Sequence, residues 1–140
     1  MARRDASALF GPEHVRNYRE TGGEYGHDWR GAPILLLTTT GRRSGEPRTN
    51  PLVYGRSGDD LLIVASKGGA PAPPGWYVNL REQPEVEVQL LDDVFRARAR
   101  TATAEERPAM WREMTSHWPD YDVYQTRTDR EIPVIVLERE

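Results

Sequence analysis

Short runs of apolar and β-branched residues, separated by only a few polar residues, constrain the fold of this chain more than any other feature. The run PILLLTTT at residues 33–40 has no polar position in its first half, which predicts a strand buried on both faces. Runs at 50–56 and 60–66 flank the turn sequence SGD, and runs at 86–91 and 94–103 flank Asp92 and Asp93, so each pair predicts a β-hairpin. A last apolar run follows at 132–138. Five or six strands joined mostly by short turns predict an α+β fold built on a largely antiparallel sheet or small barrel.

Helices are predicted around this sheet. Residues 11–21 indicate a short helix that begins near Pro12, and a glycine-rich linker follows it over residues 22–29. The sequence TAEE at 103–106 is a capping box that opens another helix, which Pro119 ends. Residues 120–131 add one or two helical turns. No repeat, low-complexity segment or linker divides the chain, so residues 1–140 are expected to form one domain.

Composition excludes several classes of function. The formal net charge of −3 argues against nucleic acid as a partner, and the absence of cysteine removes thiol nucleophiles and thiolate metal sites. His14, His27 and His117 are isolated in the sequence, so no metal site is predicted. No secretory signal precedes the helix, and the longest apolar run is too short to span a bilayer. A cytoplasmic protein without an integral membrane segment is expected; whether it associates with a membrane surface stays open.

The stretch TTTGRRSGEPRTNP at residues 38–51 concentrates positive charge between two predicted strands. Gly41 and Gly45 permit a close backbone approach, and successive amide groups in such a turn can bind an anion. Arginine forks suit phosphate and carboxylate groups, and hydroxyl side chains add further donors. The stretch indicates either an anion clamp or a plain hairpin with solvated arginines. The candidate anion-binding residues in this stretch are Arg42, Arg43, Ser44, Arg48 and Thr49.

A second segment has the same character. ASKGGAPAPPGWYVNL, at residues 65–80, leaves a predicted strand with a serine, a lysine and two glycines before Trp76 and Asn79 enter a short helix. Irregular loops of this length are more often functional than idle. The segment indicates either a second anion-binding loop or a plain exposed glycine loop. Two anion-binding loops on one sheet would suit an elongated, phosphate-bearing ligand. The candidates in this loop are Ser66, Lys67, Gly68 and Gly69.

No conventional catalytic constellation is present, so an enzymatic activity would depend on a bound cofactor. Trp118, Tyr121 and Tyr124 recur every third residue and fall near one face of a helical turn. Such rings either pack the core or wall an apolar pocket, and a phenol can donate a proton.

Taken together, four segments of this chain resemble the deazaflavin-dependent nitroreductase family. They are LLLTTTGRRSGEPRTNPL, ASKGGAPAPPGWYVNL with PEVEV, TAEERPAMWREM and PDYDVYQTRTDREIPVIVLE, in this order, and they cover the chain from about residue 11 onward. The resemblance implies a split β-barrel that binds coenzyme F-420. It also implies an enzyme that passes hydride from the reduced coenzyme to a small organic acceptor such as a quinone, an enone or a nitro compound.

The resemblance also implies residue roles. The arginines, Lys67 and the backbone near Gly68 and Gly69 would hold the anionic tail of the cofactor. Thr49, Pro51 and Leu52 would border its ring, with Trp76 and Asn79 supporting the wall of the groove. Three residues would be catalytic candidates: Ser66 and Tyr124 would lie near the substrate and the deazaflavin, and Tyr121 would line the pocket. On the acceptor side, Trp118 stands where a tyrosine is found in the nitroimidazole-activating type, and Val53 where an aromatic residue can sit.

Two alternatives remain at this point. The same arginines would suit the single phosphate of FMN in an FMN-dependent split-barrel oxidoreductase, and a non-catalytic deazaflavin carrier would use the same clamp. A split barrel also leaves edge strands that a second subunit can cover, so a homodimer is compatible with the sequence.

Overall fold

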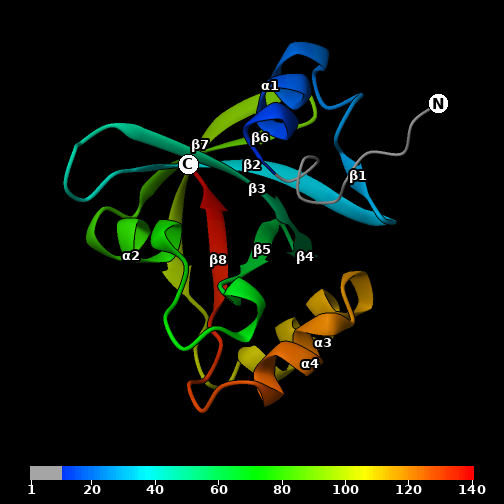
Figure 1. The fold of residues 1–140 in the computed structure, drawn as a ribbon, viewed down its shortest axis with the longest axis vertical. Coiled ribbons are helices and arrows are strands. Elements are labelled where there is room, and N and C mark those ends of the chain that lie inside the picture. The colour runs from blue at the N-terminus through cyan, green and yellow to red at the C-terminus, as the bar shows by residue number, and fades with distance from the viewer. Residues whose placement is uncertain (1–10) are drawn as a thin grey trace.

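An antiparallel sheet of eight strands, curled into a half-barrel, forms the centre of the protein (Figure 1). The structure is a computed structural model and describes residues 11–140. The strands are β1 (Asp28–Trp29), β2 (Ala32–Thr40), β3 (Pro47–Val53), β4 (Gly55–Ser57), β5 (Asp60–Val64), β6 (Glu85–Leu90), β7 (Asp93–Thr101) and β8 (Val134–Arg139). The helices are α1 (Pro12–Thr21), α2 (Gly75–Glu82), α3 (Arg107–His117) and α4 (Asp120–Thr126), with a 3-10 turn, η2 (Lys67–Gly69). The predicted α+β class is confirmed.

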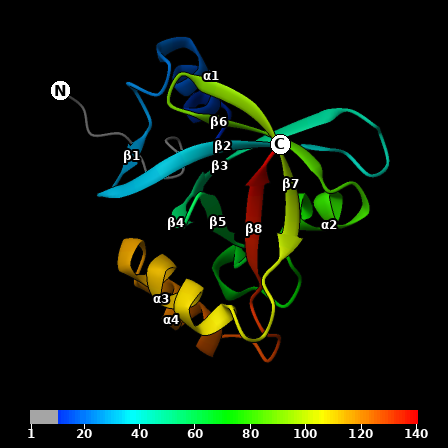
Figure 2. The same ribbon diagram turned by 180° about the vertical axis from the view of Figure 1, so that it is seen from behind.

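The strand order is β1-β2-β6-β7-β8-β5-β4, and β3 pairs with β2 outside this path. Every pairing is antiparallel. The C-terminal strand β8 lies between β5 and β7 in the middle of the sheet (Figure 2). The last apolar run of the sequence therefore completes the sheet.

Two hydrophobic clusters lie on opposite faces of β2. Leu35 and Leu37 belong to one cluster with Trp76 and Leu80 of α2. Ile34 and Leu36 belong to the other, to which α1, α3 and α4 contribute Tyr18, Met110, Met114 and Tyr121. Figure 1 shows α2 on one side of the central strands and α3 with α4 on the other. Because successive strand residues face opposite ways, the uninterrupted apolar run supplies both clusters, as predicted.

The hairpin registers differ from the boundaries predicted from the sequence in two places. The β6–β7 turn consists of Leu91 and Asp92, because Leu90 pairs with Asp93. Helix α1 selects this register: the Tyr18 hydroxyl accepts a hydrogen bond of 2.8 Å from the Leu91 amide. The predicted strand at 50–56 is divided at Tyr54, so that β3 pairs with β2 and β4 with β5.

Two further boundaries differ. The predicted linker at 22–29 ends in the short strand β1, which pairs with β2. The capping box forms as predicted, since the Thr103 hydroxyl accepts from the Glu106 amide at 3.2 Å and the Glu106 carboxylate accepts from the Thr103 amide at 2.9 Å. It closes the turn before α3, which begins at Arg107. Within the described chain, none of the helices combines the length and apolar character needed to cross a bilayer.

Candidate functional site

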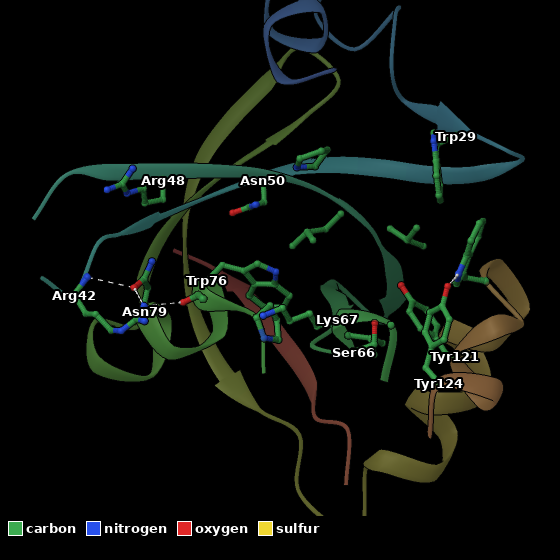
Figure 3. A pocket seen from close by; sticks show the side chains of 18 residues that line it. Trp29, Arg42, Arg48, Asn50, Ser66, Lys67, Trp76, Asn79, Tyr121 and Tyr124 are labelled. Atoms are coloured by element: carbon green, nitrogen blue, oxygen red, sulfur yellow. Dashed lines mark hydrogen bonds between the residues drawn. The ribbon is translucent and has the colours of Figure 1, made fainter. Parts of the chain in front are cut away.

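One elongated cleft of about 600 Å³ runs between β3, η2, α2 and α4 (Figure 3). Arg42, Arg48 and Asn79 lie at one end, and Trp29, Tyr121 and Tyr124 at the other, with Trp76, Ser66 and Lys67 between them (Figure 3). The residues that line it are Trp29, Arg42, Arg48, Asn50, Pro51, Leu52, Val53, Val64, Ser66, Lys67, Gly68, Pro74, Gly75, Trp76, Asn79, Trp118, Tyr121 and Tyr124.

The first end of the cleft is formed by the β2–β3 hairpin and α2. The hairpin loop is closed by a hydrogen bond of 2.7 Å from the Gly41 amide to the Glu46 carbonyl. The buried Asn79 joins this loop to α2, because its amide oxygen accepts from the Arg42 guanidinium at 2.7 Å and its amide nitrogen donates to Thr39 at 3.1 Å. The Arg42 side chain is thereby fixed at the mouth of the cleft.

The arginines at this end, and Lys67 in the middle of the cleft, form no ion pair with a carboxylate of the described residues. The arginines are Arg42, Arg43 and Arg48. A smaller hollow of about 260 Å³ adjoins the cleft and is lined by Gly41, Arg42, Arg43, Ser44, Arg48 and Asn79. Unpaired guanidinium groups around a concave surface favour the binding of an anion.

The middle of the cleft contains the backbone turn that follows β5. Ser66 has right-handed helical angles (φ −83°, ψ −42°), while Lys67 and Gly68 are left-handed, with φ of 47° and 64°. A right-handed residue followed by a left-handed one directs successive amide groups to the same side and forms an anion-binding nest. Gly69 is buried, and a side chain there would collide with the carbonyl oxygen of Tyr124. Gly69 therefore allows η2 to pack on α4.

Aromatic rings form the other end. Trp29 of β1 stacks on Trp118 with 4.8 Å between ring centroids. The Trp118 indole donates a hydrogen bond of 3.2 Å to the Tyr124 hydroxyl, and the rings of Tyr124 and Tyr121 pack edge to face at 6.1 Å. Burial, with a smaller contribution from Tyr124, raises the pKa of the Tyr121 phenol, which consequently stays protonated.

Most of the predicted site residues line this one cleft, and four do not. Arg43 and Ser44 line the adjoining hollow, and Gly69 is the buried last residue of η2, packed against α4. The Thr49 hydroxyl bonds Thr38 and accepts from Arg19, both at 2.8 Å, and Thr49 faces a separate hollow beside α1.

Sequence reasoning did not single out five lining residues: Trp29, Asn50, Val64, Pro74 and Gly75. Asn50, Pro74 and Gly75 lie inside the two loop stretches, 38–51 and 65–80, that it did examine. Trp29 carries no sequence signal, because its place in the cleft depends on the pairing of β1 with β2.

Solved structures share this architecture. One, described as an F420-H2 dependent reductase, is 44% identical and covers 76% of this chain and 94% of that chain, with a TM-score of 0.70. Another, described as a domain-swapped dimer, is 39% identical and covers 90% of this chain and 92% of that chain, with a TM-score of 0.73. With the curled antiparallel sheet, these likenesses confirm the predicted split-barrel fold.

Sequence comparison identifies the family and settles two alternatives that the sequence left open. A Mycobacterium tuberculosis protein named F420H(2)-dependent quinone reductase is 44% identical over 130 residues, which are 90% of this chain and 87% of that protein. The sequence model of the F420H(2)-dependent quinone reductases matches residues 11–139. The cofactor is accordingly coenzyme F-420 rather than FMN, and the protein is an enzyme rather than a carrier. The chain belongs to the F420H(2)-dependent quinone reductase family of oxidoreductases.

Proposed function

We propose that this protein reduces a quinone with the hydride of reduced coenzyme F-420, and that both molecules bind in the cleft described above. The observation that carries the proposal is the difference between the two ends of this cleft. Arginines that form no ion pair within the described chain lie at one end, and aromatic rings wall the other. An extended ligand with an anionic tail and a planar ring matches that arrangement.

The residues present fit such a cofactor. Arg42, Arg48 and Lys67 line the cleft and form no ion pair within residues 11–140, and the amides of the nest add neutral donors beside them. Charge-assisted hydrogen bonds to phosphate or carboxylate oxygens would hold the tail there. Arg43 extends the positive surface into the adjoining hollow. Pro51, Leu52 and Trp76 offer apolar surface to a ring in the middle of the cleft.

When bound, reduced coenzyme F-420 supplies a hydride. The protein has to hold the acceptor beside it and deliver a proton to the oxygen that becomes negative as a quinone takes up hydride. Tyr124 suits this task, because its oxygen accepts from the Trp118 indole and its own proton remains free to be donated. Ser66 lines the same cleft and is a second candidate donor. Tyr121, Trp118 and Val53 would wall the acceptor pocket.

A direct assay tests this proposal. Purified protein is mixed anaerobically with reduced coenzyme F-420 and with menadione, an enone or a nitroimidazole, and the absorbance of the oxidised deazaflavin is followed. We expect turnover with menadione. Binding of the coenzyme without oxidation by menadione or any other quinone would contradict the proposed acceptor, and turnover of the enone or nitroimidazole alone would replace it.

We also propose that the protein forms a homodimer. The solved relative described as a domain-swapped dimer, 39% identical to this chain, supports this assembly. Light scattering coupled to size-exclusion chromatography tests it, and a mass of about 16 kDa for the particle would contradict it.

A further inference from the structure

We propose that Arg130 is a positioning residue that turns the amides of the 65–70 loop toward the cleft. The proposal rests on the proposed function, because it assigns those amides to the binding of the anionic cofactor. Arg130 does not line the cleft, and nothing in the sequence distinguishes it from the other arginines of the chain.

Arg130 is half-buried, and its contacts are unusual for a cationic side chain. Its guanidinium donates three hydrogen bonds to backbone carbonyls of one short loop: Nη2 to Ser66 at 2.8 Å, Nε to Ala70 at 2.9 Å and Nη1 to Ala65 at 3.2 Å. No carboxylate of the described chain forms an ion pair with it. Arg127 adds a longer bond of 3.4 Å to the Gly68 carbonyl. Arginines thus hold this loop by its carbonyl groups.

The direction of those carbonyls determines the direction of the amides. In a trans peptide the C=O and the following N–H point opposite ways. When the carbonyls of Ala65 and Ser66 face Arg130, the amides of Ser66 and Lys67 face away from it. Lys67 also has a left-handed φ of 47°, which is unfavourable for a residue with a side chain. The three hydrogen bonds of Arg130 offset that cost and keep the nest in place.

Arg130 is itself held firmly. Its carbonyl accepts a hydrogen bond of 2.8 Å from the Gln125 side chain, and its amide donates to the Thr128 hydroxyl at 3.3 Å. Gln125 belongs to α4, which also carries Tyr124. The guanidinium therefore ties the loop in the middle of the cleft to the helix that forms its aromatic end.

Arg130→Met tests the proposal, with Arg107→Met as a matched control. Arg107 also binds backbone, the Ile132 carbonyl at 2.7 Å, and donates to the Gln125 side chain at 3.3 Å, but it forms no hydrogen bond with the 65–70 loop. We expect Arg130→Met to raise the Kd for coenzyme F-420 by about tenfold or more, because the oriented donors are lost. Deazaflavin fluorescence measures this Kd. We expect the control to lower the Tm and to leave the Kd within about twofold.

A second measurement needs no cofactor. The amides of Gly69 and Ala70 bond to the Ser66 and Lys67 carbonyls at 2.9 and 3.1 Å, so their hydrogen exchange reports on the loop. We expect faster exchange at both amides in Arg130→Met and unchanged exchange in Arg107→Met. If the unmodified protein did not bind coenzyme F-420, the proposed function would fail, while the exchange result would still decide the role of Arg130.

Arg130→Lys distinguishes the effect of hydrogen-bond geometry from the effect of charge. It also replaces Arg130→Met in the test if that variant does not fold. A lysine keeps the charge but has a single donor centre, so it cannot reach three carbonyls as a fork. We expect Kd and exchange rates between those of the parent and Arg130→Met. Parent values in Arg130→Lys or in Arg130→Met, or an equal rise of Kd in Arg107→Met, would overturn the positioning role.

Discussion

The two ends of the cleft are formed by different kinds of interaction. The cationic end consists of side chains on an exposed hairpin loop, and its arginines come from one continuous stretch, residues 42–48. The aromatic end consists of half-buried and buried rings from β1, the α3–α4 junction and α4, which pack on the second hydrophobic cluster. One end depends on charge and the other on packing.

This difference separates two tasks that one enzyme has to perform. Charge-assisted bonds to an anionic tail give affinity for the cofactor and hold it in place. Stacked rings hold a planar acceptor only where their mutual geometry is kept, and they leave a phenol where a proton is needed. Substitutions at the cationic end should therefore change cofactor binding, and substitutions at the aromatic end should change turnover or the KM for the acceptor.

The largest effect is expected for Tyr124→Phe. Loss of a positioned proton donor should lower kcat with menadione by about 100-fold, while the Kd for coenzyme F-420 stays within about twofold. Stopped-flow oxidation of the reduced coenzyme and a fluorescence titration measure the two quantities. Tyr77→Phe, on α2 but outside the cleft lining, is the matched control. An unchanged kcat in Tyr124→Phe would remove Tyr124 from the proton path.

Arg48→Met should have the opposite signature. Removal of an unpaired guanidinium from the cationic end should raise the Kd for coenzyme F-420 by about 10- to 100-fold, with a smaller change in kcat at saturating cofactor. Added salt should weaken binding less in this variant than in the parent protein, because one attractive charge is missing. Arg96→Met, on the exposed side of β7, controls for the loss of charge alone. If both variants bound the cofactor as the parent does, the cationic end would not be its site.

The contrast between the two ends also explains what the sequence could predict. Burial of β2 on both faces follows from the apolar run at Ile34 to Leu37, and the anion-binding loop follows from the arginines around Gly41 and Gly45. Both are local patterns, in which neighbouring residues act together. They could be recognised before any fold was known.

The aromatic end and the loop support are not local. Trp29 reaches Trp118 across 89 positions of sequence, and Arg130 reaches Ala65 across 65. Only the pairing of β1 with β2 and the position of β8 in the sheet bring these residues together. Likewise, the β6–β7 turn falls at Leu91 because Tyr18 binds its amide, a tertiary contact that overrides the turn preference of the Asp92-Asp93 pair.

Trp29→Ala tests the packing half of the comparison with a smaller expected effect. Loss of one ring of the stacked pair should raise the KM for menadione by about two- to tenfold and leave the Kd for coenzyme F-420 unchanged. Trp29→Phe keeps an aromatic ring, so its KM for menadione should lie close to that of the parent protein. Steady-state kinetics at saturating cofactor measure both. A raised Kd for coenzyme F-420 without a change in the KM for menadione would place Trp29 in cofactor binding. It would then contradict the assignment of different tasks to the two ends.

The smallest effect is expected for Glu106→Gln, which loosens the attachment of α3 to the sheet. The Glu106 carboxylate accepts from Arg100 at 2.7 and 2.9 Å, and this bond, followed by that from the Thr103 amide, lowers its pKa to about 2 from an ordinary value of 4.5. A carboxyl whose pKa is lower in the folded state stabilises the protein above its ordinary pKa, and this contribution is lost as the pH falls toward the folded value. The Tm difference between the parent and Glu106→Gln should therefore be greatest near neutral pH and shrink as the pH is lowered from about 5 toward 2.

Thermal unfolding of both proteins from pH 7 to pH 3 measures this difference. A Tm difference that stays constant with pH would attribute the effect to lost packing instead of lost charge.

Because Glu106 precedes α3, and α3 leads to Trp118 and α4, any functional change should appear in the KM for menadione. The Kd for coenzyme F-420 should not change, since Arg42 at the cationic end is attached to α2 and β2 through Asn79. A change in Kd alone would mean that the two ends are mechanically coupled, and Arg130, which joins α4 to the loop after β5, is the contact through which such coupling would pass.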